Sequence, residues 1–208
     1  MRDVLIPYAD AATAAAVVHS TQFWLERAVI GLNLCPFAKA VHVKRQIRYA
    51  VTAATSAAEL LAELRHELQL LQQAKPEEVE TTLLIHPQAL TDFIDFNFFL
   101  PEADRAIRDL GLEGTLQVAS FHPAYEFAGS APDDVTNCTN RSPHPMLHLL
   151  RETSIDRAVA AYPDAAAIYE RNIETLRRLG PAGWRRLWMR EADCGNENRD
   201  DRAQPVNT

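Results

Sequence analysis

The chain has 208 residues, of which 47% are hydrophobic, with a formal net charge of −7 and a sequence pI of about 5.5. This length suffices for one well-buried core, so we expect a single globular domain over 1–190. The acidic balance argues against a nucleic-acid partner, because no basic field is available to neutralise phosphates. No stretch approaches the ~18 uncharged apolar residues of a membrane helix, and no signal-peptide pattern is visible. We therefore expect no membrane partner and a cytoplasmic location.

Helix-forming composition predicts a long first helix over 11–34, which Pro36 should end or redirect. A further helical turn is expected over 37–42, because proline favours the first position of a helix. The alternating, β-rich segment 46–51 predicts a strand. The Ser-Ala-Ala-Glu spacing that starts at Ser56 is typical of a capping box and predicts a strongly amphipathic helix after it.

Two more strand-like runs follow, over 80–85 and 115–121. Between them Thr91 is the expected cap of a helix that Pro101 should kink or split and that Gly111 closes. This alternation is typical of linked βαβ units with parallel strands. We predict an α/β (or α+β) fold with about three strands linked by crossover helices. The long first helix and the C-terminal helices should pack on the sheet.

Helices are also predicted towards the C-terminus. Pro145 is expected at the first position of a helix that continues to Pro163. A second helix over 164–179 should end at Gly180-Pro181. The last residues, 191–208, lack apolar side chains to bury, so they are predicted to form a disordered tail.

The most informative segment is 117–152, which contains three His, two Arg, two Asp, two Glu, two Asn and one Cys. A long connection without periodicity that carries so many polar side chains is typically functional or disordered, and its Phe, Tyr and Pro residues argue against disorder. His86-Pro87 and His122-Pro123 each follow a predicted strand. If the two strands are parallel, both histidines lie at the ligand-binding rim of the sheet. The alternative is that each histidine simply bonds a loop carbonyl.

One interpretation of the segment is a divalent metal site. His144, His148 and Glu152 are spaced four residues apart, which would align them on one face of a helix. Two imidazoles one turn apart can chelate zinc or non-haem iron, with a further ligand from an acidic residue or another histidine. The alternative is a capping His144 and a His148 that bonds Glu152. The candidate metal ligands are His86, His122, His144 and His148.

A competing interpretation is a site for a small anionic ligand. Guanidinium groups and the free amides of a helix start at Pro145 would suit a phosphate or carboxylate. The candidate substrate-binding residues are Arg141, Arg151, Asn137, Asn140, Ser142 and Tyr125. The alternative is that the two arginines pair with Asp133, Asp134 or Glu152 and pin the loop. Either arrangement would order the segment.

The three cysteines, Cys35, Cys138 and Cys194, are far apart and predict neither disulfides nor a cysteine-rich zinc site. A thiol near a helix start is a better nucleophile, so Cys35 is a candidate reactive group. The alternative is a buried Cys35 that packs beside Phe37. The candidate catalytic residues are therefore His122, His148, Asp134 and Cys35.

Several long stretches resemble the bacterial and plastid family known as domain of unknown function 1415. They are WLERAVIGLNLCPFAKA, IRYAV, TTLLIHP, DFIDFNFFL, LQVASFHPAYEFAG and DDVTNCTNRSPHPMLHLLRE, and they cover most of 23–188. The resemblance carries no catalytic roles to individual residues. It pairs the Cys-Pro-Phe segment with the long polar segment as characteristic stretches, which is compatible with Cys35 lying near the loop.

Three functions are compatible with these features. The favoured one is a small-molecule enzyme, with histidine as acid or base and an anionic substrate, because histidine suits proton transfer at neutral pH. The second is a non-catalytic binding or assembly protein in which the polar loop is a structural clamp and the apolar helices form a homo-oligomer interface. The third is thiol chemistry at Cys35.

Overall fold

The computed structural model describes residues 11–160 and 166–188 as a mixed α/β fold. One sheet contains β1 (Ile47–Val51), β2 (Thr81–Ile85), β3 (Leu116–Phe121) and β4 (Met146–Arg151). The α-helices are α1 (Ala11–Trp24), α2 (Ala38–Val43), α3 (Ala57–Gln73), α4 (Phe93–Asp109), α5 (Glu152–Ala160) and α6 (Ala166–Arg186). A π-helical segment η1 (Leu25–Ile30) continues α1, and a 3-10 turn η2 (Val135–Thr139) lies in the polar loop. The predicted fold class is confirmed.

The sheet has the strand order β1-β2-β4-β3. β1 pairs with β2 in parallel, as expected for strands joined by the crossover helix α3. β4 is antiparallel to both of its neighbours, so β1, β2 and β3 run in the same direction. Their carboxyl ends therefore meet at one edge, called here the carboxyl rim. At this rim Ile85 and Phe121 both pair with Met146, the first residue of β4.

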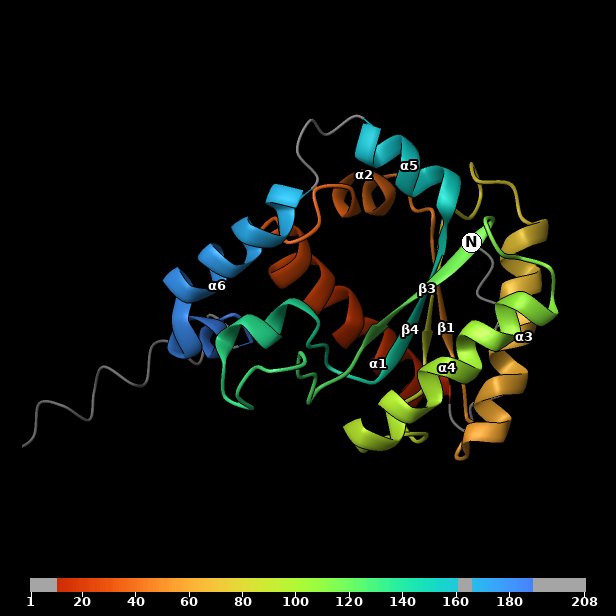
Figure 1. Cartoon of the computed structure of the whole chain (residues 1–208), viewed down its shortest axis with the longest axis horizontal. Helices are drawn as coiled ribbons and strands as arrows, with labels where there is room; N and C mark the ends of the chain where they lie inside the picture. Colours follow the sequence, from red (N-terminus) through yellow and green to blue (C-terminus); the bar gives the residue numbers. More distant parts are fainter. Residues whose placement is uncertain (1–10, 161–165, 189–208) are drawn as a thin grey trace, which may run out of the picture.

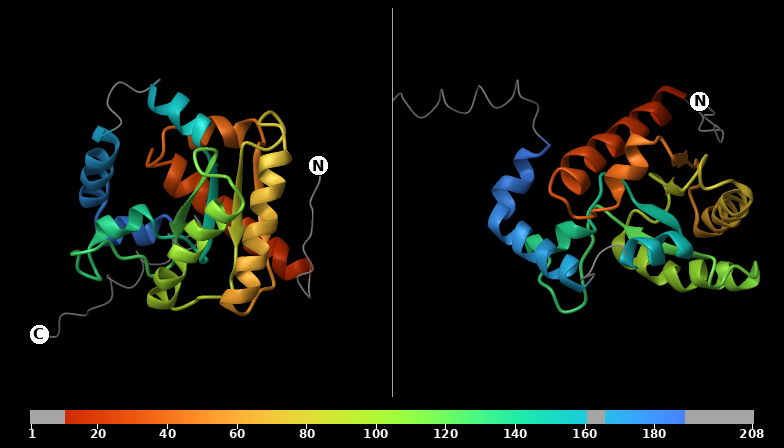
Figure 2. Two further views of the ribbon diagram at one scale, coloured as in Figure 1. Left: turned by 45° about the vertical axis from the view of Figure 1, so that its right-hand side comes forward. Right: turned by 90° about the horizontal axis from the view of Figure 1, so that it is seen from above.

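Helices cover both faces of the sheet. Figures 1 and 2 show α3 and α4 on one side and α1 with η1 on the other. The α3 and α4 side is packed by buried residues that include Leu60, Leu64, Leu68, Leu84, Phe96 and Leu149. The α1 side is packed by Trp24, Leu25, Ala28, Val29, Leu83, Ile85 and Met146. α6 lies beyond the sheet, against η2 of the polar loop (Figure 1).

The predicted capping box starts α3. Ser56 accepts the backbone N–H of Glu59, and the Glu59 carboxylate accepts the backbone N–H of Ser56. From the same helix Glu67, fully buried, receives two hydrogen bonds of 2.7 and 2.9 Å from Arg48 of β1. This bidentate pair fixes α3 against the edge strand of the sheet.

The start of α4 differs from the prediction. Asp92, not Thr91, is the N-cap, because its carboxylate accepts the backbone N–H groups of Ile94 and Asp95. The helix also runs through Pro101 instead of splitting there. Pro101 is exposed, so the carbonyl that lacks its usual N–H partner lies on the solvent side of the helix.

The predicted helix from Pro145 is wrong over its first residues, because Met146–Arg151 is strand β4. Apolar residues occur on both faces of this strand, as is usual for a strand buried between two neighbours. Leu147 and Leu149 pack towards α3 and α4, whereas Met146 packs towards α1. Pairing with β2 and β3 overrides the helical pattern, and α5 begins only at Glu152. The sheet therefore has four strands where about three were predicted.

The remaining helices agree closely with the predictions. The first helix ends at Gly31 rather than near 34, and α2 occupies most of the predicted turn after Pro36. Gly180 has φ of 66° and interrupts α6 at the predicted break. Pro163 and the predicted tail lie outside the described residues. Within 11–160 and 166–188, no helix combines the length and apolar character needed to cross a bilayer.

Candidate functional site

His86 and His122 lie together at the carboxyl rim, as the two His-Pro dipeptides predict. Each imidazole packs against Phe96 of α4, with ring centroids 5.6 and 5.2 Å away. Backbone hydrogen bonds tie both residues to the chain that enters β4. The backbone N–H of His86 donates to the Pro145 carbonyl at 3.0 Å, and that of His122 donates to the Asn140 carbonyl at 3.2 Å.

Both imidazoles are neutral at physiological pH. Nδ1 of His86 donates to the Ala89 carbonyl at 2.9 Å, so Nε2 carries a lone pair, which is buried without a partner among the described residues. Burial lowers the pKa of His86 to about 4. Nδ1 of His122 accepts the Ala124 N–H at 3.1 Å, so Nε2 donates to the Leu90 carbonyl at 3.3 Å. Burial lowers the pKa of His122 as well.

His144 and His148 point to the opposite side of the sheet. Nε2 of His144 lies 2.8 Å from Oγ of Ser20 in α1, and Nε2 of His148 lies 2.8 Å from Oγ1 of Thr81 in β2. The four histidines thus form two pairs on two faces. Among residues 11–160 and 166–188, no three His, Cys, Asp or Glu side chains are grouped so as to hold a metal ion. The helical face predicted for His144, His148 and Glu152 is wrong, since the segment is a strand.

The polar side chains of the loop bond mainly to the loop itself. Asn137, fully buried, accepts the Phe127 N–H and the Ser130 hydroxyl and donates to the Ala131 carbonyl. Asp134 accepts the backbone N–H and the hydroxyl of Thr136, which caps η2, and these bonds lower its pKa. Asp133 is exposed. The loop is therefore ordered by its own hydrogen bonds.

Arg141 is also used within the loop. Its guanidinium donates to the carbonyls of Tyr125 and Pro132 at 3.1 and 2.6 Å, and its own carbonyl accepts the Trp24 indole N–H. Asn140 donates to the Ser120 carbonyl and Ser142 to the His144 carbonyl. The Tyr125 ring packs against Phe93 and Phe127. No helix starts at Pro145, so the predicted anion site at a helix N-terminus is wrong.

Arg151 lies far from the carboxyl rim and bonds to the protein backbone. It lies at the opposite end of β4, where one guanidinium nitrogen donates to the carbonyls of Leu71, Ala74 and Val79 at 2.6, 2.7 and 3.2 Å. Those carbonyls belong to the end of α3 and the segment that follows it. Arg151 is 8% exposed, and burial lowers its pKa. The two arginines thus lie at separate places and bond separate carbonyls.

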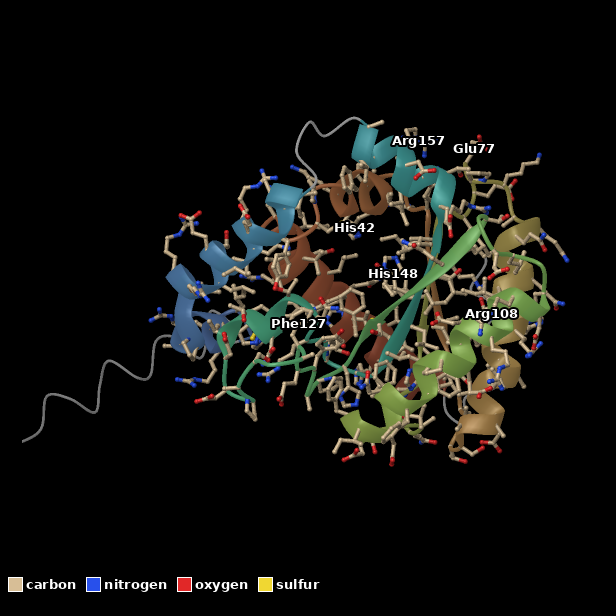
Figure 3. The ribbon with its side chains drawn as sticks, viewed as in Figure 1. His42, Glu77, Arg108, Phe127, His148 and Arg157 are labelled. Atoms are coloured by element: carbon tan, nitrogen blue, oxygen red, sulfur yellow. The ribbon has the colours of Figure 1, made fainter. Side chains whose placement is uncertain are left out.

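The α1 side of the sheet carries the second histidine site. Tyr49, Leu83, His148 and Ala119 pair in one row across β1, β2, β4 and β3. His148 is half-buried, although β4 is flanked by strands on both sides, whereas Leu83 of the same row is buried. We call the half-buried residues Ala119, His148 and Leu150 on this side of the sheet the open face. Figure 3 shows His148 and His42 reaching towards the same region from β4 and α2.

The hydrogen bonds around His148 define its tautomer. The Thr81 hydroxyl donates to the Leu149 carbonyl at 2.6 Å, so its oxygen accepts from Nε2 of His148. Nδ1 therefore carries the lone pair. Burial lowers the pKa of His148 to about 4, so the imidazole is neutral over the physiological range. The arrangement is a fixed, neutral base on a partly accessible surface.

Three further polar groups, Tyr49, Glu26 and His42, lie on the α1 side of the sheet and were not predicted from the sequence. The Tyr49 hydroxyl is buried without a partner among the described residues, and burial together with the charge of Glu26 raises the Tyr49 pKa to about 12. Glu26 in turn lies 3.2 Å from Nε2 of His42 in α2. The alternating pattern of 46–51 could have assigned Tyr49 to one face of the sheet. No local sequence pattern, however, predicts that Glu26 of η1 and His42 of α2 lie near that face.

Cys35 and Cys138, the two cysteines among the described residues, differ in burial and in the residues that they contact. Cys35 is half-buried and packs against the apolar cluster on the α1 side. Cys138 is buried with Leu34 and Leu176, and burial raises its pKa, which keeps the thiol protonated. The turn that contains Leu34 and Cys35 therefore lies beside the polar loop, an arrangement with which the resemblance is compatible.

A family model described as "Protein of unknown function (DUF1415)" matches residues 16–186. The chain belongs to this family. The matched range includes every strand, the polar loop and both histidine pairs. Neither the comparison with curated proteins nor that with solved structures gave a match.

Proposed function

We propose that this DUF1415 protein is a small-molecule enzyme in which His148 accepts a proton from its substrate on the open face. The observation that carries the proposal is the state of His148 itself. It is a neutral imidazole with Nε2 bonded to Thr81 and its Nδ1 lone pair without a partner among the described residues. Titratable groups with strongly perturbed pKa values occur preferentially at functional sites.

The neighbouring groups support an acid–base role. Tyr49 remains protonated at neutral pH because its pKa is raised to about 12, so its buried hydroxyl is a donor without a partner among the described residues. Tyr49 and His148 lie in one row two strands apart, which corresponds to about 10 Å between their backbones. Glu26 and His42 supply a further acid–base pair beside Tyr49.

The proposal includes neither a metal nor an arginine clamp from the polar loop. The candidate ligands His86 and His122 lie on the other side of the sheet from His148. Arg141 and Arg151 donate to backbone carbonyls instead of facing the open face. The proposed reaction class is therefore proton abstraction or proton transfer on a small substrate, with no step that needs a metal.

A ligand screen tests the proposal. A library of small polar metabolites is screened by thermal shift with wild-type protein and with His148→Asn, and each hit is tested for turnover by NMR. We expect a ligand that raises the melting temperature of the wild type, binds His148→Asn at least about tenfold more weakly and is converted only by the wild type. His66→Asn, an exposed change on α3, is the control. Equal binding to wild type and His148→Asn by every hit would contradict the proposal.

A second candidate function is a non-catalytic binding or assembly protein with the polar loop as a clamp. The observation that favours it is the use of Asn137, Arg141 and Arg151 in bonds to the protein's own backbone. It predicts that Arg141→Ala lowers the melting temperature sharply, whereas His148→Asn leaves ligand binding unchanged. Ligand binding that His148→Asn leaves unchanged, without any turnover, would favour this alternative.

A further inference from the structure

A cavity of about 440 Å³ lies away from both histidine pairs, between the turn that follows η1 and the first turns of α6. The turn contributes Gly31, Asn33 and Pro36, and α6 contributes Arg171, Thr175 and Arg178 among others. Sites for small molecules in proteins usually have volumes of roughly 300–1,000 Å³. The cavity is therefore large enough for a metabolite and not only for an inorganic ion.

The walls of the cavity are held together by buried contacts. Asn172 is 7% exposed and donates from its side chain to the Leu34 carbonyl at 2.9 Å, which joins α6 to the turn. Leu34, Cys138 and Leu176 form a small apolar cluster directly behind this bond. Asn33 has φ of 54°, a conformation that asparagine tolerates better than most residues. These contacts hold the turn after η1 against α6.

The charge of the lining is opposite to that of the protein. The whole chain has a net charge of −7, yet the charged residues that line the cavity are two arginines and one glutamate. Arg171 and Arg178 are seven residues apart and Glu174 lies between them. Arg178 makes no ion pair within 11–160 or 166–188, and Arg171 donates from Nε to the Ala167 carbonyl. Arg178 is thus the guanidinium best able to receive an anionic group.

The remaining lining residues are suited to the polar part of a ligand. The Asn33 amide and the Thr175 hydroxyl can each donate and accept hydrogen bonds. A guanidinium provides a planar pair of donors that fits carboxylate and phosphate oxygens. We propose that this cavity binds a small hydroxylated metabolite that carries a carboxylate or phosphate, with its anionic group on Arg178. The inference is independent of the role proposed for His148.

Calorimetric titration of the full-length protein at low ionic strength tests this proposal. The probes are glycerol 3-phosphate, citrate and inorganic phosphate, and uncharged glycerol is the negative control. We expect saturable binding of at least one anionic probe and none of glycerol. The phosphate and citrate arms show which anionic group the cavity prefers. Absence of saturable binding for all three anions would overturn the proposal.

Matched variants locate the binding. Arg178→Gln should weaken binding at least about tenfold, because a charge-assisted hydrogen bond is lost, and Thr175→Val should weaken it less. Arg108→Gln on α4 is the control, since it makes the same charge change at an exposed position outside the cavity. Circular dichroism and melting temperature establish that each variant is folded. Wild-type affinity in Arg178→Gln, or equal weakening in Arg108→Gln, would also overturn the proposal.

Discussion

Nε2 of His148 donates a hydrogen bond of 2.8 Å to Oγ1 of Thr81 on the neighbouring strand. The hydroxyl is held in turn because it donates to the Leu149 carbonyl, which belongs to the backbone of β4 itself. His148 of β4 and Thr81 of β2 are therefore joined to each other and to the β4 backbone by two successive hydrogen bonds. These bonds fix both the orientation and the tautomer of the imidazole.

We predict that Thr81→Val lowers the free energy of unfolding by about 1–3 kcal/mol, because it leaves a buried imidazole N–H without its acceptor. Urea denaturation measures this loss. In the wild type, imidazole ¹⁵N chemical shifts should identify the Nε2–H tautomer at pH 7. Thr91→Val is the control, since Thr91 is exposed and is not the cap of α4. Equal stability of Thr81→Val and the control would be inconsistent with this hydrogen-bond chain.

We predict that stability falls as the pH is lowered from about 6.5 to about 4. His86 has its pKa lowered by burial from 6.5 to about 4, so below 6.5 the unfolded chain binds a proton that the native state does not. The contribution of neutral His86 to the free energy of unfolding is fully present above pH 6.5 and is lost progressively as the pH falls towards 4. For His86 it amounts to about 3 kcal/mol. His148 has the same direction of shift and adds to the loss.

Chemical denaturation at pH 7.5, 6, 5 and 4 measures this dependence. His86→Asn should reduce the slope between pH 6.5 and 4, although it also lowers stability at neutral pH. His66→Asn, at an exposed position, is the control. A wild-type stability that is flat over this range would show that the imidazoles of His86 and His148 titrate normally.

We predict that Arg151→Met lowers the free energy of unfolding by about 2–4 kcal/mol. The change keeps an apolar stem but leaves the carbonyls of Leu71, Ala74 and Val79 without their donor. Thermal and urea unfolding give the loss, and Arg108→Met at an exposed position of α4 is the control. If Arg151 acted on a substrate instead, the two variants would have the same stability.

We predict that Glu67→Gln lowers the free energy of unfolding by about 3–5 kcal/mol, because the half-buried Arg48 loses its carboxylate partner. The double change Arg48→Met with Glu67→Leu should recover most of this loss, since no buried charge remains. Glu102→Gln breaks the exposed pair with Arg105 and should cost less than about 1 kcal/mol. A double variant no more stable than Glu67→Gln would refute the explanation by an unpaired charge.

Local signals in the sequence specified much of the fold. The capping box at Ser56 depends on side chains three residues apart, and it forms as predicted. The His-Pro dipeptides mark strand ends because proline cannot continue the hydrogen-bonding pattern, so His86 and His122 could be assigned to one rim. The break at Gly180 follows equally from a residue that tolerates positive φ.

The sequence did not specify the strand at 146–151. MLHLLR has apolar residues at spacings that fit a helix and a doubly buried strand equally well, and only the gap between β2 and β3 selects the strand. That single difference moves His148 from a helical metal face to the open face. It also removes the helix start on which the predicted anion site depended.

By itself, therefore, the sequence determined the α/β class, the elements with local start and stop signals and the segment richest in polar groups. Only the tertiary structure decided which of those groups bond to the backbone and which remain accessible. The physical reason is the range of the interactions involved. Caps and turns depend on neighbours within a few residues, whereas the partners of Arg151 and His148 are 72 to 80 and 67 residues away along the chain.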